Sequence, residues 1–106
     1  MKVLPVHLRE SAVADLDGIA FDIALASSSP DVGLGFMQRI RNRCLKIGNV
    51  PMGGVSREDL GAGIRMVPFE HSAVILYRVT ERRVEIVNVF FGGRDYEAIL
   101  RSQKPV

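Results

Sequence analysis

The spacing of apolar positions changes along the chain, and each spacing predicts one kind of element. Every second position from Leu4 to Leu8 is apolar, which is typical of a strand over residues 2–8. Pro5 lacks an N–H donor and therefore favours a sheet edge. Apolar residues then recur every three or four positions up to Ser27, which predicts an amphipathic helix of about four turns with Ser11 as its N-cap.

A second helix is predicted to follow at once. Ser29 can cap it, Pro30 suits its first position, where the missing N–H is not needed, and Gly48 suits its end. Two helices joined by so few residues form an antiparallel hairpin. Gly33 and Gly35 each cost about 1 kcal/mol relative to alanine within a helix. Two alternatives would explain these glycines: close approach of the first helix or of another chain, or a frayed first turn of the second helix. The apolar stripe of this helix comprises Phe36, Ile40, Cys44 and Ile47.

Three further strands are predicted over residues 64–69, 73–80 and 84–91, and short polar links join each neighbouring pair as a hairpin. Residues 48–63 are predicted to be a loop, with one helical turn at residues 57–60. The last strand is apolar on both faces, which is typical of a central strand. Its faces are assigned as Val84, Ile86 and Phe90 on one side and Val87, Val89 and Phe91 on the other.

These elements predict an α+β fold of the type β-α-α-β-β-β. The helical hairpin covers one face of a four-stranded sheet with strand order 1-4-3-2, and a short C-terminal helix or tail follows. The 106 residues fit a single domain over residues 1–106, and 47% apolar content argues against disorder. The sequence begins without the apolar core of a signal peptide and holds no window of membrane-spanning length, so we expect a cytoplasmic protein with no membrane partner.

Charge and candidate chemistry narrow the function classes. A net charge of +2 is too small to imply nucleic acid. Basic residues cluster in the second helix and face either solvent or an acidic partner. The only histidines, His7 and His71, have no ligand spacing with Cys44, so we expect no metal and no cofactor. Arg65 and Arg78 lie within apolar strands, where a charge needs a partner or solvent. Asp95 can pair with one of these arginines, and phosphate contact is the alternative.

Several stretches resemble the ParE toxins of bacterial toxin–antitoxin modules, within the RelE/ParE superfamily. They are "SAVADLDGIAFDIA", "PDVGLGFMQRIRNRCLKIGNVPMGG", "DLGAGIRMVPF" and "VILYRVTERRVEIVNVFFGGRDYEAIL", in this order over nearly the whole chain. The resemblance implies the same fold and a toxin of a type II module that inhibits DNA gyrase. It also implies neutralisation by a ParD-like antitoxin, a ribbon–helix–helix protein that would provide the only link to DNA.

RelE-like relatives instead cut messenger RNA on the ribosome with basic residues and often a C-terminal tyrosine. Val74 stands where those enzymes carry an arginine, and the loop before the second strand has no lysine. Since a cleaved phosphate needs cations placed in advance, the sequence favours a toxin that is not an enzyme. The alternatives are a ribonuclease, with Arg65, Arg94 and Tyr96 as catalytic residues, and a degenerate member that binds only its antitoxin.

Two groups of site residues follow from these hypotheses. Those expected to anchor the sheet surface and support toxicity are Arg65, Tyr77, Arg78, Arg94 and Asp95. Those expected to pair with acidic residues of the antitoxin are Arg39, Arg43 and Lys46 on the second helix.

Overall fold

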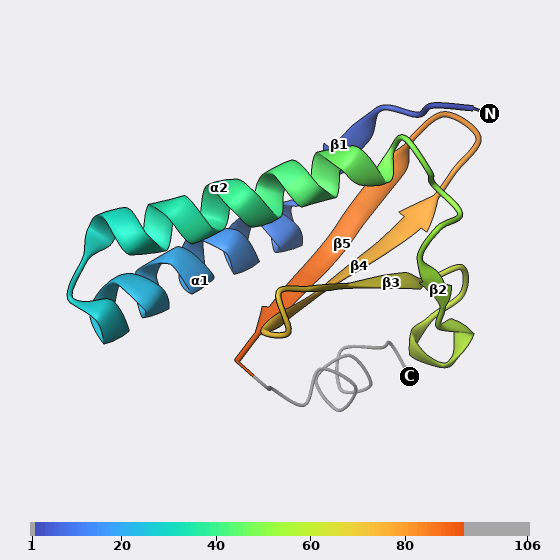
Figure 1. Cartoon of the computed structure of the whole chain (residues 1–106). Helices are drawn as coiled ribbons and strands as arrows, with labels where there is room; N and C mark the ends of the chain where they lie inside the picture. The colour runs from blue at the N-terminus through green and yellow to red at the C-terminus, as the bar shows by residue number, and fades with distance from the viewer. Residues whose placement is uncertain (1, 93–106) are drawn as a thin grey trace.

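A computed structural model describes residues 2–92, and Figure 1 shows a helical hairpin packed beside one sheet. The elements in chain order are β1 (Val6–Leu8), α1 (Glu10–Ser27), α2 (Pro30–Ile47), β2 (Val55–Ser56), η1 (Glu58–Leu60), β3 (Arg65–Phe69), β4 (Ala73–Val79) and β5 (Val84–Phe91). No helix among the described residues has the length and hydropathy that a membrane crossing requires.

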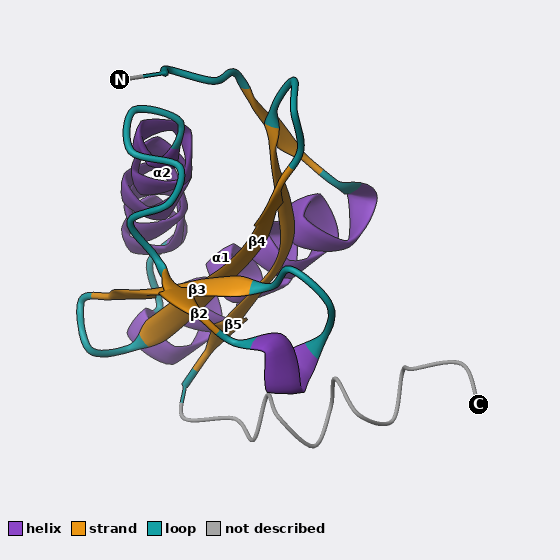
Figure 2. Cartoon of the chain, turned by 90° about the vertical axis from the view of Figure 1, so that its right-hand side faces the viewer, coloured by secondary structure: helices purple, strands orange, loops and turns teal. Residues whose placement is uncertain are grey.

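The sheet has five strands in the order β1-β5-β4-β3-β2, so the prediction of four strands is wrong. The relative order of the four expected strands is as predicted, and the additional strand is β2, at the edge farthest from β1 (Figures 1 and 2). Val55 and Ser56 pair with Met66 and Arg65 of β3. Two residues are too few to produce a periodic pattern, so the sequence predicts only a loop here.

β5 is central, as its apolar character predicts, with β1 parallel on one side and β4 antiparallel on the other. The predicted division of its faces fails after Ile86. The register with β4 shifts between Leu76 and Tyr77, and Val87 is the extra residue of this bulge. An extra residue exchanges the faces of everything that follows it. Val89 therefore packs in the same cluster as Ile86.

The helix ends match the predicted caps only in part. Ser29 accepts a hydrogen bond from Val32 N and precedes Pro30 at the first helical position, so this cap is confirmed. α1 instead begins at Glu10, and the Ser11 hydroxyl donates to a carbonyl of β5, so Ser11 is not the N-cap. The helix simply starts before the first residue whose side chain could cap it.

The close approach of the two helices explains Gly33, whereas Gly35 has no such contact. A Cβ atom at Gly33 would lie closer than 3.0 Å to Ala20 O and 3.2 Å from Ala24 N. The helices therefore meet backbone to backbone at this point. A larger core lies between the hairpin and the sheet, and a smaller cluster lies on the other sheet face. The buried members of the smaller cluster are Leu60, Ile64, Leu76 and Phe90.

Candidate functional site

A buried tyrosine of β4 fixes the loop that connects α2 with β3. The Tyr77 side chain is fully buried, and its hydroxyl accepts a hydrogen bond from Gly54 N and donates one to Pro51 O, both at 2.8 Å. A Cβ atom at Gly54 would come within 3.0 Å of the tyrosine ring, so this position excludes a side chain. Because buried main-chain groups need hydrogen-bond partners, the hydroxyl determines the path of the chain from Pro51 to Gly54.

Two arginines of the sheet bind carbonyl groups of the same loop. Arg65 Nη1 donates to Gly54 O at 2.7 Å and to Met52 O at 3.2 Å. Arg78 Nε donates to Ala62 O at 2.9 Å. These carbonyls are the partners that two charges within apolar strands require, and no sequence pattern points to them.

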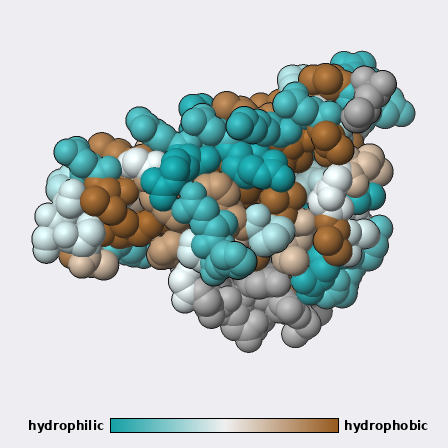
Figure 3. Space-filling model, in the orientation of Figure 1, coloured by the Kyte–Doolittle hydropathy of each residue, from teal (hydrophilic) through white to brown (hydrophobic). Residues whose placement is uncertain are grey.

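We call residues 48–64 the clamped loop, because the predicted site residues Arg65, Tyr77 and Arg78 all hold it. These side chains bind main-chain groups of Pro51, Met52, Gly54 and Ala62, while three apolar side chains of the loop face solvent. These are Val50, Met52 and Val55, which are 54%, 62% and 61% exposed. Figure 3 shows apolar side chains at the surface near both ends of the molecule. Apolar groups held in solvent by an ordered loop are typical of an interaction surface.

Of the three residues predicted to form the cationic face of α2, Arg39 is already paired within the described part of the chain, and the side chains of Arg43 and Lys46 are not. Arg39 binds Glu70 of the β3–β4 turn through two hydrogen bonds of 3.0 and 3.2 Å, and its guanidinium lies 5.3 Å from the centre of the Phe36 ring. The Arg39 guanidinium lowers the pKa of the Glu70 carboxyl, and Glu70 raises the pKa of Arg39. The side chains of Arg43 and Lys46 make no hydrogen bond or ion pair with any residue that the structure describes.

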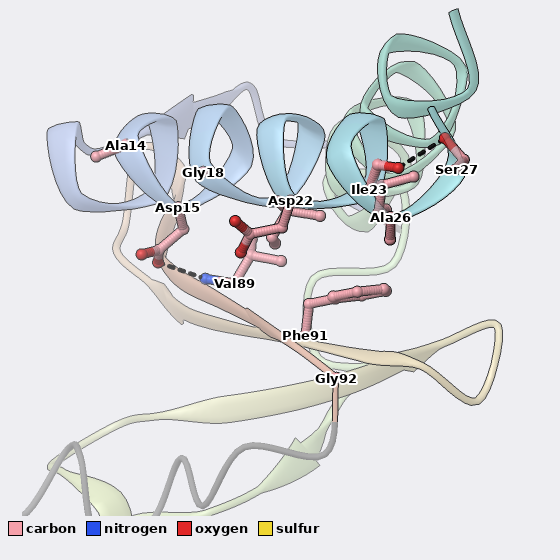
Figure 4. Close-up of a pocket in the computed structure, with 11 residues that line it drawn as sticks. Ala14, Asp15, Gly18, Asp22, Ile23, Ala26, Ser27, Val89, Phe91 and Gly92 are labelled. Carbon is pink, nitrogen blue, oxygen red and sulfur yellow. Dashed lines mark hydrogen bonds between the residues drawn. The ribbon is translucent and has the colours of Figure 1, made fainter. Parts of the chain in front are cut away.

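A groove between α1 and the end of β5 was missed by sequence reasoning (Figure 4). It is open, with a volume of about 750 Å³. Asp15 Oδ2 accepts hydrogen bonds from Asn88 Nδ2 and Val89 N, both at 2.9 Å, and Asp22 also lines the groove. Helical spacing of Asp15, Gly18 and Asp22 was the signal for a shared face, but no pattern shows which strand edge that face meets.

The remaining predicted residues, Arg94, Asp95 and Tyr96, lie outside the described residues. Within residues 2–92 no group of histidine, cysteine, aspartate or glutamate side chains has the arrangement of a metal site. Cys44 is buried, and this burial raises the pKa of its thiol to about 12. A thiol with such a pKa stays protonated at neutral pH and is a poor nucleophile.

Comparison with known proteins identifies the family. The family model described as the ParE toxin of the type II toxin–antitoxin system parDE matches residues 6–96. The chain belongs to the ParE toxin family. The resemblance seen in the sequence is confirmed, and the chain is a type II toxin of the ParE type.

A solved structure of another protein has a fold similar to that of this ParE family member. It is a chain from the chromosomal ParDE toxin–antitoxin system of P. aeruginosa, with a TM-score of 0.72 and 22% identity. The likeness covers 85% of this chain and 97% of that one. At this identity the similarity concerns the fold. None of the curated proteins matches the chain significantly.

Proposed function

We propose that this ParE-type toxin inhibits DNA gyrase in the cytoplasm by binding it, and that a ParD-like antitoxin neutralises the toxin. The observation that carries the proposal is the use of the sheet arginines. Arg65 and Arg78 donate to three carbonyl groups of the clamped loop, and Tyr77 donates to a fourth. These side chains shape a surface, which is what an inhibitor that acts by binding requires.

The same contacts argue against phosphate chemistry at this sheet. Stabilising a cleaved phosphate requires cations aimed at the position of the developing charge. Val74, which stands where ribonucleases of the superfamily carry an arginine, packs against the smaller apolar cluster. Of the three ribonuclease candidates, only Arg65 lies among the described residues. Its Nη1 donates to Gly54 O and Met52 O, which commits part of the guanidinium to holding the clamped loop.

The clamped loop is the surface we assign to the target. Replacing an exposed apolar side chain there should weaken binding without unfolding the protein, because exposed positions contribute little to stability. Met52→Gln tests this, and Leu25→Gln on α1 is the matched control, since the two side chains are 62% and 65% exposed.

The experiment is a supercoiling assay with purified gyrase, run beside an assay for cuts in ribosome-bound messenger RNA. We expect the wild-type chain and Leu25→Gln to inhibit supercoiling, Met52→Gln to inhibit it less, and RNA to stay intact. Codon-periodic RNA cuts with normal supercoiling would overturn the proposal in favour of a ribonuclease. Antitoxin binding without either effect would identify a degenerate member.

The antitoxin contact is assigned to the cationic face of α2. The side chains of Arg43 and Lys46 have no hydrogen-bond partner among the described residues, whereas Arg39 is already paired with Glu70. Co-purification with the product of the adjacent gene tests this. The double variant with Arg43→Glu and Lys46→Glu should bind the antitoxin less, and Arg82→Glu, an exposed change in the β4–β5 turn, should not.

The C-terminal residues extend the proposal beyond the described structure. We propose that Arg94 and Asp95 anchor the C-terminal segment, so that Arg94→Ala weakens toxicity. Growth arrest on expression of this variant, compared with wild type at equal protein level, measures the effect. Full toxicity of the variant would remove Arg94 from the site.

A further inference from the structure

The central strand β5 has an open edge, because its neighbour on one side is much shorter. β1 pairs with β5 only from Val84 to Ile86, whereas β5 continues to Phe91. Beyond Ile86, α1 passes over this side of β5 and forms the groove of Figure 4. The main-chain groups of that strand edge need partners other than a strand.

Side chains of α1 satisfy the first part of the open edge. The Ser11 hydroxyl donates to Val87 O, and the Asp15 carboxylate accepts from Val89 N. These two contacts take the place of the hydrogen bonds that a longer β1 would make with β5. They also show that successive main-chain groups on this edge point toward α1.

The next groups along the edge have no partner among the described residues. Gly92 N donates to Ser72 O, which makes this pair a hydrogen-bonded pair of the antiparallel β4–β5 ladder. Hydrogen-bonded and non-bonded pairs alternate, so Val89 and Phe91 turn their main-chain groups away from β4. The carbonyl of Val89 and both main-chain groups of Phe91 therefore face the groove, where no residue between 2 and 92 pairs with them.

The α1 side of this groove is lined largely by apolar side chains, and Gly18 contributes none. The apolar residues of α1 that line it are Ala14, Ile19, Ile23 and Ala26, beside the two carboxylates of Asp15 and Asp22. An extended segment placed here would bury apolar side chains and complete the hydrogen bonding of β5.

Gly18 has no explanation within the described chain. A glycine in the middle of a helix costs about 1 kcal/mol relative to alanine. At Gly33 the neighbouring helix leaves no space for a Cβ atom, but a Cβ atom at Gly18 would meet nothing within 4 Å. The space above Gly18 is therefore open to an incoming group.

Asp22 gives the occupant its charge. Its carboxylate lines the groove opposite Val89 and Phe91 (Figure 4) and makes no hydrogen bond or ion pair with any described residue. A Lys or Arg side chain on the occupant would complement it. We propose that the groove binds an extended, apolar segment of a separate protein, which pairs with the open edge of β5 and places one basic side chain beside Asp22.

This inference is independent of the gyrase proposal, and a defined probe tests it. The probe is a short acetylated peptide in which valine and threonine alternate around one lysine, and the control peptide has glutamate in place of lysine. Titration into the full chain is followed by NMR, together with hydrogen exchange of the Phe91 amide. We expect fast exchange of this amide in the free protein and protection by the lysine peptide.

Matched variants distinguish the groove from other surfaces. The lysine peptide should bind about threefold tighter than the glutamate peptide, as for an exposed ion pair. Asp22→Lys should reverse this preference, whereas Asp17→Lys, the same charge change on the same helix outside the groove, should keep it. Gly18→Leu should weaken binding about tenfold or more by filling the groove, and Gly35→Leu on α2 should not.

Four results would overturn the proposal. The first is an unchanged Phe91 signal at saturating lysine peptide, and the second is the same peptide preference in Asp22→Lys as in wild type. The third is slow exchange of the Phe91 amide in the free chain, which would mean that the chain itself fills the slot. The fourth is a self-association that Gly18→Leu abolishes, which would make the occupant a second copy.

Discussion

Removing one oxygen atom, by Tyr77→Phe, tests whether the tyrosine holds the clamped loop. The substitution keeps the ring and its packing, so it creates almost no cavity. It removes the acceptor for Gly54 N and the donor to Pro51 O. Both residues are buried, so neither main-chain group gains water without a change in the loop.

The expected loss of stability follows from these two orphaned groups. A buried donor or acceptor left without a partner costs about 1–3 kcal/mol. Arg65 still holds Gly54 O and Met52 O, which limits how far the loop can relax. For two such groups we therefore expect the free energy of unfolding to fall by about 2–6 kcal/mol, a large part of the roughly 5–15 kcal/mol typical of a domain.

Urea denaturation measures the total loss, and hydrogen exchange of the Gly54 amide locates it. The control is Thr80→Val, which also removes a hydroxyl group, but from an exposed turn where that hydroxyl contacts Arg83 O. We expect faster exchange at Gly54 in Tyr77→Phe and unchanged exchange in Thr80→Val. An unchanged Gly54 amide together with wild-type stability in Tyr77→Phe would refute the reasoning.

Three further predictions concern single positions. Gly18→Ala should raise the free energy of unfolding by about 1 kcal/mol and Gly33→Ala should lower it, because only the second Cβ atom meets another helix; thermal denaturation compares them, and equal signs would contradict the packing. Cys44 should resist iodoacetamide at neutral pH in the folded protein and react once urea unfolds it, since burial raises the pKa of its thiol to about 12. Arg39 lowers the folded-state pKa of Glu70, so the ion pair stabilises the protein above the unfolded-state pKa of Glu70. This contribution disappears as pH falls through the lowered folded-state pKa of Glu70. The difference in the free energy of unfolding between wild type and Arg39→Met should therefore shrink below about pH 4.

The outline of the candidate site could be predicted from sequence, but its connections could not. Charged residues within apolar strands identified Arg65 and Arg78 as residues that need partners. Their partners are backbone carbonyls of a loop some 11 to 16 positions away, and any residue type supplies a carbonyl. Sequence patterns carry no information about which carbonyl is reached, so the clamp appeared only in the structure.

The groove illustrates the same limit for a surface. Asp15, Gly18 and Asp22 share a helix face by spacing alone. What lies opposite them depends on the length of β1, which leaves one edge of β5 without a neighbouring strand beyond Ile86, and on the bulge at Val87. A three-residue strand and a one-residue insertion are too short to alter a periodic pattern, yet they decide where the main-chain groups of β5 point.

The sequence by itself determined the two helices, the central position of β5, the order of the four longer strands and the family. Each of these depends on apolar periodicity or turn residues, which are local properties that a stretch of chain carries wherever it packs. Tertiary structure alone decided the fifth strand, the exchange of faces after Ile86, the clamp on the loop and the open edge beside α1. These features arise from contacts between residues far apart in the chain, and their energy comes from satisfying main-chain groups that are the same at every position.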